Sequence, residues 1–381
     1  MDALIDKVKK EAAGRAIVMP VFGDAESLAT AAICVKACGG DKVNAIHINH
    51  GMLREGECEA ICLSLARIGV KNVITLSLEK AFMISSVKTE DGRVVGPLAT
   101  ACDPMDKRSI VIATLEKIYQ KAVLENFGED VCMIGVHSVG GEGLDFCGNV
   151  EEIARNAGAD ESLIRQPFPI QGFSIRMLCN ESPIAVTTKQ RETLEMTVKD
   201  ASNGKFASKL IPFRSVGICE GVRSYKSMAV ICGAQTCNFV DAADIARKID
   251  GELGFVNRVL VRTDSLDKNF QLHGSPMYIS KETLATVRIA DAIVADEFKS
   301  TGAVQFFAVL LPFSSNMKKY SVAIRAVSTS DFKSAKALVP TVDFDATVLE
   351  SATRRIKEAL PAVDMVFYDI TPKPPAAIEF E

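Results

Sequence analysis

A short loop near the N-terminus has the position of a phosphate-binding site but unusual residues for one. The apolar run Ala16–Phe22 predicts a buried strand, and Glu26–Cys38 predicts a helix that closes at two glycines. A loop between a strand and a helix N-terminus commonly binds phosphate, because free backbone N–H groups and the helix dipole point at the ligand. This loop instead carries two carboxylates, those of Asp24 and Glu26.

The four histidines do not suggest a metal site. His47 and Asn49 fall on one face of the strand expected at Val43–Asn49, whereas His50 leaves that strand. His137 and His273 stand alone in the sequence, and no third ligand lies at a recognisable spacing. We therefore expect no zinc.

Composition narrows the class of protein. The 381 residues are 48 % hydrophobic and 24 % charged, with a net charge of -4 and no long basic run. This predicts a globular protein of two or three domains that partners neither nucleic acid nor membrane. The first 14 residues predict an amphipathic helix rather than a signal peptide. The 11 scattered cysteines, none in a C-x-x-C motif, indicate reduced core residues and a cytosolic location.

The first part of the chain alternates strands and helices, which predicts a doubly wound, mostly parallel sheet. We expect strands at Ala16–Phe22, Val43–Asn49 and Asn72–Leu78, an apolar segment at Val131–Val136, and helices at Glu26–Cys38, Arg54–Ile68, Ser109–Asn126 and Asn149–Ala157. The prolines and glycine of Arg165–Gly172 predict a break after this part.

The second part contains an internal repeat. The segments Lys209–Gly217, Tyr225–Ala234, a helix at Ala242–Leu253 and Phe255–Asp264 read strand, strand, helix, strand. The same order recurs at Val309–Asn316, Tyr320–Thr329, a helix at Ala346–Leu360 and Ala362–Thr371. We interpret this as a duplicated β-β-α-β module, over about 205–265 and 305–381, that packs within one chain or across a dimer.

Four segments resemble the synthetase half of GMP synthase: Gln166–Arg176 (QPFPIQGFSIR), Val304–Pro312 (VQFFAVLLP), Tyr320–Phe332 (YSVAIRAVSTSDF) and Tyr368–Glu381 (YDITPKPPAAIEFE). The family patterns are close to HPFPGPGLAIR, WQAFAVLLP and YDITSKPPATIEWE. His47–Glu57 and Asp103–Val111 also resemble family segments, so the resemblance covers nearly the whole chain. The duplicated module is similar to the longer form of the enzyme in eukaryotes.

The resemblance implies a fold and a reaction. The expected fold is α/β: an ATP-pyrophosphatase-like domain over 1–170 of the adenine nucleotide alpha hydrolase type, then an α+β dimerisation domain over 171–381. The family activates XMP with ATP and Mg²⁺, releases pyrophosphate, and uses ammonia to form GMP and AMP. The resemblance does not extend to the glutaminase half, and we expect no catalytic-cysteine elbow for releasing ammonia from glutamine in these residues.

The loop departs from the family pattern S-G-G-x-D-S, which wraps pyrophosphate and places Mg²⁺. The corresponding residues here are Phe22, Gly23, Asp24, Ala25, Glu26 and Ser27. A carboxylate ~4 Å from a phosphate charge costs about 4 kcal/mol at an effective dielectric near 20, roughly a thousandfold in affinity. Glu26 remains a candidate Mg²⁺ ligand, because it is only one methylene longer than the family aspartate.

Other nucleotide positions also differ. Asn49 replaces the family aspartate after the second strand, and Met133–Gly143 lacks the Gln, Pro and acids of its family counterpart. The family segment I-K-T/S-H-H-N has no equivalent after Gly143. Lys107 and Arg108 stand where the family lid carries basic residues; the alternative is a solvated helix start.

The positions that bind XMP are better retained. The resemblance assigns this role to Arg176, Arg223, Gln305, Lys373, Ile378 and Glu379. Arg176 and Lys373 would contact the monophosphate, and Arg223 corresponds to an arginine that reaches the phosphate from a partner subunit. The alternative for the C-terminal residues is a role in dimer packing alone.

Three functions are compatible with this pattern. The first is a catalytically degenerate GMP synthase homologue that keeps an XMP or GMP pocket and acts as a homodimer, or as a heterodimer with a synthase homologue. The second is an active XMP aminase, which would need ATP, Mg²⁺ and ammonia from elsewhere. The third is an interaction scaffold without a nucleotide role, in which Lys373→Ala would affect only stability.

Overall fold

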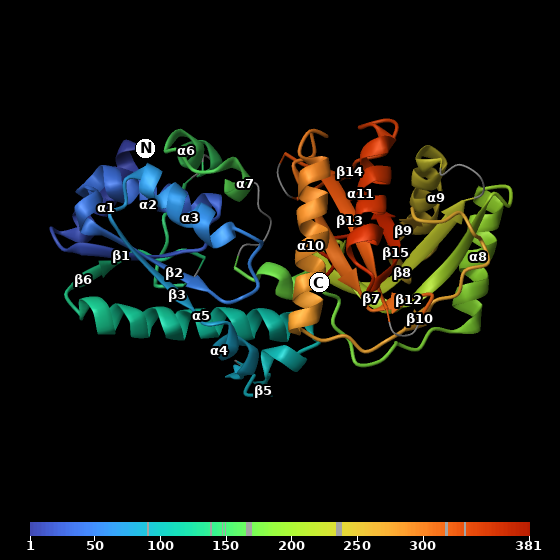
Figure 1. Cartoon of the computed structure of the whole chain (residues 1–381), viewed down its shortest axis with the longest axis horizontal. Helices are drawn as coiled ribbons and strands as arrows, with labels where there is room; N and C mark the ends of the chain where they lie inside the picture. The colour runs from blue at the N-terminus through green and yellow to red at the C-terminus, as the bar shows by residue number, and fades with distance from the viewer. Residues whose placement is uncertain are drawn as a thin grey trace. The chain divides into compact units, whose positions relative to one another are not determined.

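The structure, a computed structural model, describes all residues except 90, 138, 147, 149, 165–169, 234–237, 317, 318, 331 and 332. The chain forms two compact units (Figure 1). One comprises residues 1–101 and 105–172, and the other comprises residues 102–104 and 173–381. The first five residues of the expected break at Arg165–Gly172 lie outside the described residues.

The first unit contains a parallel sheet with strand order β3-β2-β1-β6. Its strands are β1 (Ala16–Val21), β2 (Val43–Asn49), β3 (Asn72–Ser77) and β6 (Val131–Met133). A two-stranded hairpin joins β4 (Val87–Lys88) to β5 (Val94–Val95). The helices are α1 (Asp2–Ala12), α2 (Ala25–Cys38), α3 (Glu57–Ile68), α4 (Glu79–Ile84), α5 (Pro104–Phe127), α6 (Val150–Asn156) and α7 (Glu161–Ile164).

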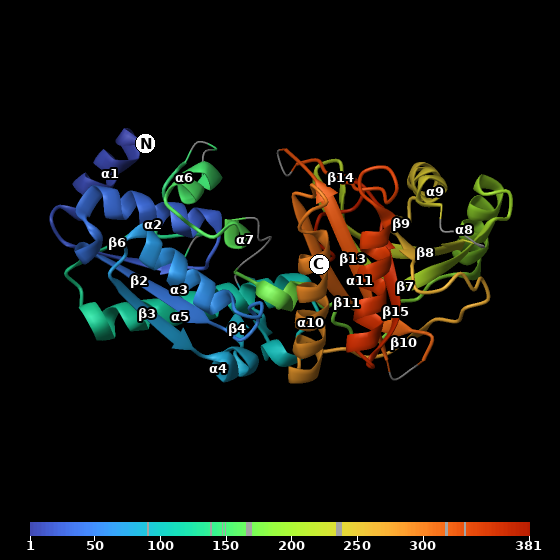
Figure 2. The same cartoon turned by 45° about the horizontal axis from the view of Figure 1, so that its top comes forward.

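Helices cover both faces of this sheet, as expected for parallel strands that are buried on both sides. Helices α2 and α3 lie over one face and α5 runs along the other (Figures 1 and 2). The hydroxyl of Tyr119 in α5 donates a hydrogen bond of 3.0 Å to the carbonyl of Val18 in β1. The parallel α/β architecture predicted from the sequence is therefore confirmed.

The second unit is built on a mixed sheet with strand order β11-β13-β15-β9-β8-β7, and β14 pairs with β13. Its strands are β7 (Phe206–Cys219), β8 (Val222–Gly233), β9 (Val256–Arg262), β11 (Gln305–Leu311), β13 (Tyr320–Ser328), β14 (Lys336–Ala337) and β15 (Val363–Asp369). A separate pair is formed by β10 (His273–Gly274) and β12 (Phe313–Ser314). The helices are α8 (Thr188–Ala201), α9 (Phe239–Glu252), α10 (Lys281–Phe298) and α11 (Ala346–Ala359).

The two halves of this sheet repeat one pairing pattern within a single chain. Strands β7 and β8 pair antiparallel and β8 and β9 pair parallel, and β11, β13 and β15 repeat this order. In both parallel pairs the register shifts beside the first residue of the last strand. The shift lies between Ser227 and Met228 opposite β9, and between Tyr320 and Ser321 opposite β15. The halves join through the antiparallel pair of β9 and β15. The duplicated β-β-α-β order is thus present, and its two copies pack against each other inside the chain.

A helix that the sequence analysis missed precedes each copy. Thr187 and Ser280 cap α8 and α10, each with a capping box completed by the residue three positions later. A Ser-Pro pair, Ser182-Pro183 or Ser275-Pro276, stands five residues before each cap. The repeated unit is therefore longer than expected, with the order α-β-β-α-β.

Candidate functional site

The loop after β1 is held in a conformation that only glycine adopts without strain. Gly23 has a φ of +85°, and a Cβ atom there would lie 2.5 Å from the side chain of Ile61 in α3. The flanking Phe22 and Asp24 are buried. The loop therefore keeps the backbone turn of a strand-to-helix phosphate site.

Three backbone donors of this loop, the N–H groups of Phe22, Gly23 and Ser27, are already used by its own side chains. The N–H groups of Phe22 and Gly23 donate to Ser27 Oγ over 3.3 and 3.1 Å. The N–H of Ser27 donates to Asp24 Oδ1 over 3.1 Å, which makes Asp24 the N-cap of α2. Ser27 Oγ donates in turn to the carbonyl of Asp24 over 3.1 Å. Three N–H groups at this helix N-terminus that could bind an anion are therefore engaged by the loop's own side chains.

A histidine bridges the two carboxylates of the loop. Nε2 of His137 contacts Asp24 Oδ2, and Nδ1 lies 3.3 Å from Glu26 Oε2. Carboxylate oxygens only accept hydrogen bonds, so Nε2 donates to Asp24, and the second carboxylate beside Nδ1 favours the charged imidazolium. The ring centroid of Phe22 lies 6.1 Å from that of His137. The expectation that His137 stands alone was wrong.

The bridge changes the pKa of both main partners. Burial of His137 disfavours its charged form, but the hydrogen bond and charge of Asp24, together with Glu26, outweigh this and raise the histidine pKa. Burial of Asp24 disfavours its ionised form, yet the contact with His137 outweighs this and lowers the aspartate pKa. Both shifts stabilise the charged pair.

The loop residues do not fit a bound pyrophosphate. The N–H groups of Phe22, Gly23 and Ser27 are occupied, and two carboxylates stand where the ligand charge would lie. His137 also competes with Mg²⁺ for the oxygens of Glu26. In the part of the chain that the structure describes, no group of three His, Cys, Asp or Glu residues is arranged to hold a metal ion.

A cavity lies at the end of the neighbouring strand β2. Asn49 ends β2, and its Oδ1 accepts the N–H of Gly51 over 2.8 Å. A cavity of about 490 Å³ lies beside it, lined by Asn49, Gly51 and the segment 77–81. His47 Nδ1 lies 3.0 Å from the carbonyl of Val21, so this nitrogen donates. The side chain of Asn49 therefore stabilises the turn that follows β2, at the position where the resemblance implies an aspartate.

The residues assigned to XMP binding occupy different environments. Arg176 is buried and forms an ion pair of 2.8 Å with Asp291, with its guanidinium 5.0 Å from the ring centroid of Phe307. Ile378 and Gln305 are buried, and Lys373 is half-buried. Arg176 thus has a structural partner that the sequence analysis missed, since Asp291 lies 115 residues away.

Arg223 and Glu379 are brought together. Arg223 Nη2 lies 3.8 Å from Glu379 Oε1, and the Arg223 side chain is 43 % exposed. Both residues belong to the same chain. The structure therefore gives Arg223 a contact inside its own unit, and its role in reaching a phosphate bound by a partner subunit stays a prediction.

The C-terminal segment is fixed by a buried charge cluster that the sequence analysis also missed. Arg258 in β9 and Arg325 in β13 both contact Oδ2 of Asp369 in β15, and all three side chains are fully buried. Nη2 of Arg258 donates to the carbonyls of Ala377 and Glu379, over 3.0 and 2.6 Å. The cluster joins both copies of the repeat to the segment that ends the chain.

The predicted lid residues lie in the first two turns of α5. Lys107 is completely buried, and Arg108 is half-buried. The alternative of a solvated helix start is therefore wrong for Lys107. The role of these residues in a lid stays a prediction.

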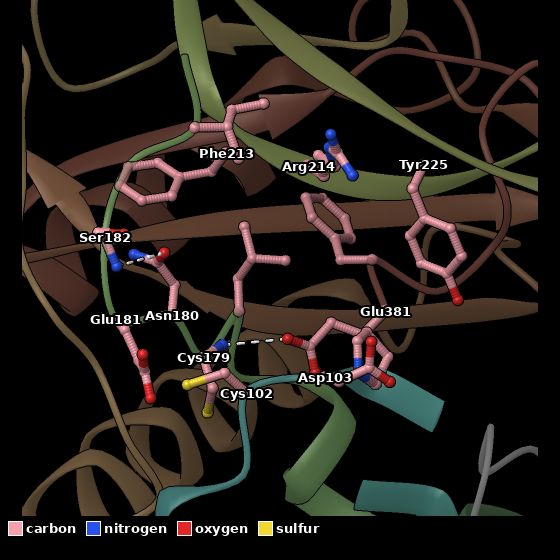
Figure 3. A pocket seen from close by; sticks show the side chains of 14 residues that line it. Cys102, Asp103, Cys179, Asn180, Glu181, Ser182, Phe213, Arg214, Tyr225 and Glu381 are labelled. Carbon is pink, nitrogen blue, oxygen red and sulfur yellow. Dashed lines mark hydrogen bonds between the residues drawn. The ribbon is translucent and has the colours of Figure 1, made fainter. Parts of the chain in front are cut away.

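A second cavity belongs wholly to the second unit. It has a volume of about 430 Å³ and is lined by residues of 102–104, of the segment 178–184, of β7 and β8, and by Phe380 and Glu381 (Figure 3). None of the six residues assigned to XMP lines it. The sequence analysis did not identify this cavity.

Several cysteines of the described residues are free thiols in the core. Cys34, Cys132, Cys179 and Cys232 are buried free thiols, and burial raises the pKa of Cys232 to about 11. Cys147 and Cys237 lie outside the described residues. Within the described ranges, no helix combines the length and the apolar character needed to cross a membrane.

Comparison with known proteins defines the class of this protein. Residues 292–380 match the family described as GMP synthase C terminal domain. Within the second unit of this two-unit α/β protein, residues 292–380 are therefore similar to the C-terminal domain of GMP synthases.

Similarity to individual proteins extends along the whole chain. The chain is 20 % identical to a GMP synthase [glutamine-hydrolyzing] of Dictyostelium discoideum, over 99 % of this chain and 64 % of the relative. It is 26 % identical to one of Aeropyrum pernix, over 99 % and 60 %, and 25 % identical to one of Alkalilimnicola ehrlichii, over 100 % and 59 %. The protein is thus a homologue of GMP synthases over its full length, at low identity, and spans about 60 % of the length of these curated relatives.

Proposed function

We propose that this GMP synthase-like protein is a catalytically degenerate homologue that does not activate XMP with ATP. The observation that carries the proposal is the loop after β1, in which Ser27 and Asp24 occupy three backbone donors and His137 bridges Asp24 and Glu26. A ligand phosphate would have to displace these internal bonds and lie beside two carboxylates. The free energy of both processes opposes binding.

The test is binding of Mg-ATP to the whole protein, measured by calorimetry beside an authentic GMP synthase. We expect no saturable binding by this chain in the range where the authentic enzyme saturates. A variant with Phe22→Ser, Asp24→Gly and Glu26→Asp restores the family residues and tests whether the loop alone is responsible. Binding of Mg-ATP by the unaltered chain at an affinity near that of the authentic enzyme contradicts the proposal.

The proposed role of the second unit is to bind a purine monophosphate, XMP or GMP. The pairing of Arg223 with Glu379 and the half-buried position of Lys373 support it. Arg176 does not support this role, because its guanidinium already forms an ion pair with Asp291. Lys373→Ala should weaken XMP binding at least tenfold if Lys373 contacts the phosphate.

The proposed regulation acts through association with a second copy or with an authentic synthase. The homology over both units supports a shared assembly surface. Light scattering of the chain alone, and of its mixture with a GMP synthase, measures this directly. A monomer in both samples contradicts a regulatory role through dimerisation. We further propose that residues 1–170 are the ATP-pyrophosphatase-like domain and that residues 171–381 are the dimerisation domain.

The alternative is an active XMP aminase that receives ammonia from another protein. One observation favours it: the side chain of Glu26 is 34 % exposed and can reach solvent. Under this alternative, Mg-ATP binds to the unaltered chain, and the reversion of Phe22 and Asp24 barely changes turnover.

A further inference from the structure

The cavity of about 430 Å³ in the second unit has the size of a small-molecule site. None of the six residues assigned to XMP lines it. Aromatic rings supply much of its wall: Phe213, Tyr225 and Phe380. Figure 3 shows the rings of Phe213 and Tyr225 at opposite sides of the cavity. Flat rings of this kind favour a planar ligand, because aromatic surfaces stack.

The aromatic walls are fixed before any ligand binds. The ring of Phe213 stacks on that of Phe313, with centroids 6.0 Å apart and planes inclined by 9°. The guanidinium of the buried Arg258 lies 3.8 Å from the centroid of Phe380. A preformed wall lowers the ordering cost of binding.

The charge of the cavity selects against anions. Its lining contains three carboxylates, those of Asp103, Glu181 and Glu381, and one guanidinium, that of Arg214. Glu381 is 2 % exposed, and its Oε1 accepts the N–H of Cys179 over 3.0 Å, which fixes the carboxylate in place. The surplus of acceptors and negative charge favours a ligand that offers N–H donors and carries no net negative charge.

We propose that this cavity binds a planar heteroaromatic molecule that presents adjacent N–H donors and has no net negative charge, such as the guanine base of a nucleoside. A guanine base offers N1–H and the 2-amino group on one edge, which matches the two oxygens of a carboxylate. The hypoxanthine base of inosine has only one of these donors. Xanthosine presents an oxygen at position 2 and loses a proton near neutral pH. A phosphate group, as in GMP, adds negative charge to a cavity that already has a surplus of it.

The experiment is a titration of the full chain with guanosine, inosine, xanthosine and GMP, followed by calorimetry and by saturation-transfer NMR. We expect guanosine to bind most tightly, and inosine roughly tenfold more weakly, because one charged hydrogen bond is lost. Xanthosine and GMP should bind more weakly than guanosine, and added salt should narrow the gap to GMP.

Variants locate the site. Glu381→Gln keeps an acceptor for the N–H of Cys179 but removes the charge, and it should weaken guanosine binding about tenfold. Glu181→Gln and Tyr225→Leu change exposed residues, so they test the same cavity without a large effect on folding. Glu358→Gln, an exposed glutamate of α11 paired with Arg354, is the matched control and should leave binding unchanged.

Three results would overturn the proposal. The first is no guanosine binding up to about 1 mM, the weak end of specific affinity. The second is GMP or xanthosine binding as tightly as guanosine, which would mean that the carboxylates do not select the ligand. The third is guanosine binding that all three cavity variants leave unchanged.

Discussion

The contact of His137 with Asp24 and Glu26 is the residue-scale feature on which the proposed loss of phosphate binding rests. It explains why a strand-to-helix loop tolerates two buried or half-buried acids. The imidazolium supplies the positive charge that a Mg²⁺ ion would otherwise have to supply. The negative charges of Asp24 and Glu26 thus interact with a positive charge that the protein itself supplies, that of His137.

The bridge predicts how stability depends on pH. His137 has a raised pKa, so its contribution is fully present below its ordinary value of 6.5 and is lost as pH rises through the folded-state pKa. Asp24 has a lowered pKa, so its contribution is present above 3.8 and is lost as pH falls through the folded-state pKa. The bridge therefore stabilises the protein most between these two values.

The variant His137→Gln tests this pH dependence. We expect it to lower the free energy of unfolding by about 1 to 3 kcal/mol within that window. The deficit should shrink as pH rises above the window. Urea unfolding at a series of pH values measures it, with His273→Gln, an exposed histidine of β10, as the control. A deficit that is constant from pH 4 to pH 9 would contradict the assignment of an imidazolium.

Gly23 and Gly14 form a matched pair for testing the packing of the loop. Their φ angles are +85° and +86°, but a Cβ atom at Gly14 would meet no atom within 4 Å. Gly14→Ala should therefore cost only the left-handed strain of about 1 to 2 kcal/mol. Gly23→Ala should cost roughly 1 to 3 kcal/mol more, because the methyl group collides with Ile61. Thermal melts of both variants compare the two costs, and equal losses would mean that the loop is loosely packed.

At the scale of elements, the sequence was most informative where apolar periodicity is strong. Strands β1, β2, β9 and β15 were placed within a few residues, because their side chains are buried almost continuously. Helices α8 and α10 were missed. Helix α8 is mostly polar, and its capping signal at Thr187 is local and easily overlooked.

Contacts between distant segments could not be predicted from periodicity. His137 meets Asp24 across 113 residues, and Arg176 meets Asp291 across 115. One signal was available for the first pair: β6 neighbours β1 in a parallel sheet, so the loops at their carboxyl ends must approach each other. No comparable signal in the sequence indicated that Arg258 and Arg325 would contact Asp369.

The capping residues of α8 and α10 carry a prediction at this scale. Thr187→Ala and Ser280→Ala should each lower the stability of the second unit by about 1 kcal/mol, because each removes a hydrogen bond to a helix N-terminus. Thr188→Ala, one residue further into α8, is the control and should change stability by less than about 0.5 kcal/mol. Equal effects of Thr187→Ala and Thr188→Ala in thermal melts would show that the cap is not stabilising.

At the scale of the whole molecule, the second unit is a pair of similar modules locked by one charge cluster. Arg258 comes from the first copy, and Arg325 and Asp369 come from the second. Removing the shared carboxylate leaves two buried guanidinium groups without a counter-charge. Loss of this carboxylate should therefore destabilise both copies and the C-terminal segment together.

Asp369→Asn tests this coupling. We expect a loss of about 3 to 5 kcal/mol in the free energy of unfolding, because buried charges remain uncompensated. Glu358→Gln breaks an exposed pair of α11 and should cost less than about 1 kcal/mol. Denaturant unfolding of the full chain gives both values. A loss for Asp369→Asn no larger than that for Glu358→Gln would mean that the cluster does not hold the unit together.

The measurement that tests the central claim most directly is pyrophosphate release by the purified full chain. The assay contains Mg-ATP, XMP and excess ammonium, and an authentic GMP synthase at equal concentration is the reference. If the loop after β1 has lost its phosphate site, no XMP-dependent release above background will be detected. XMP-dependent release at a rate near that of the reference would contradict the claim and identify the chain as an active XMP aminase.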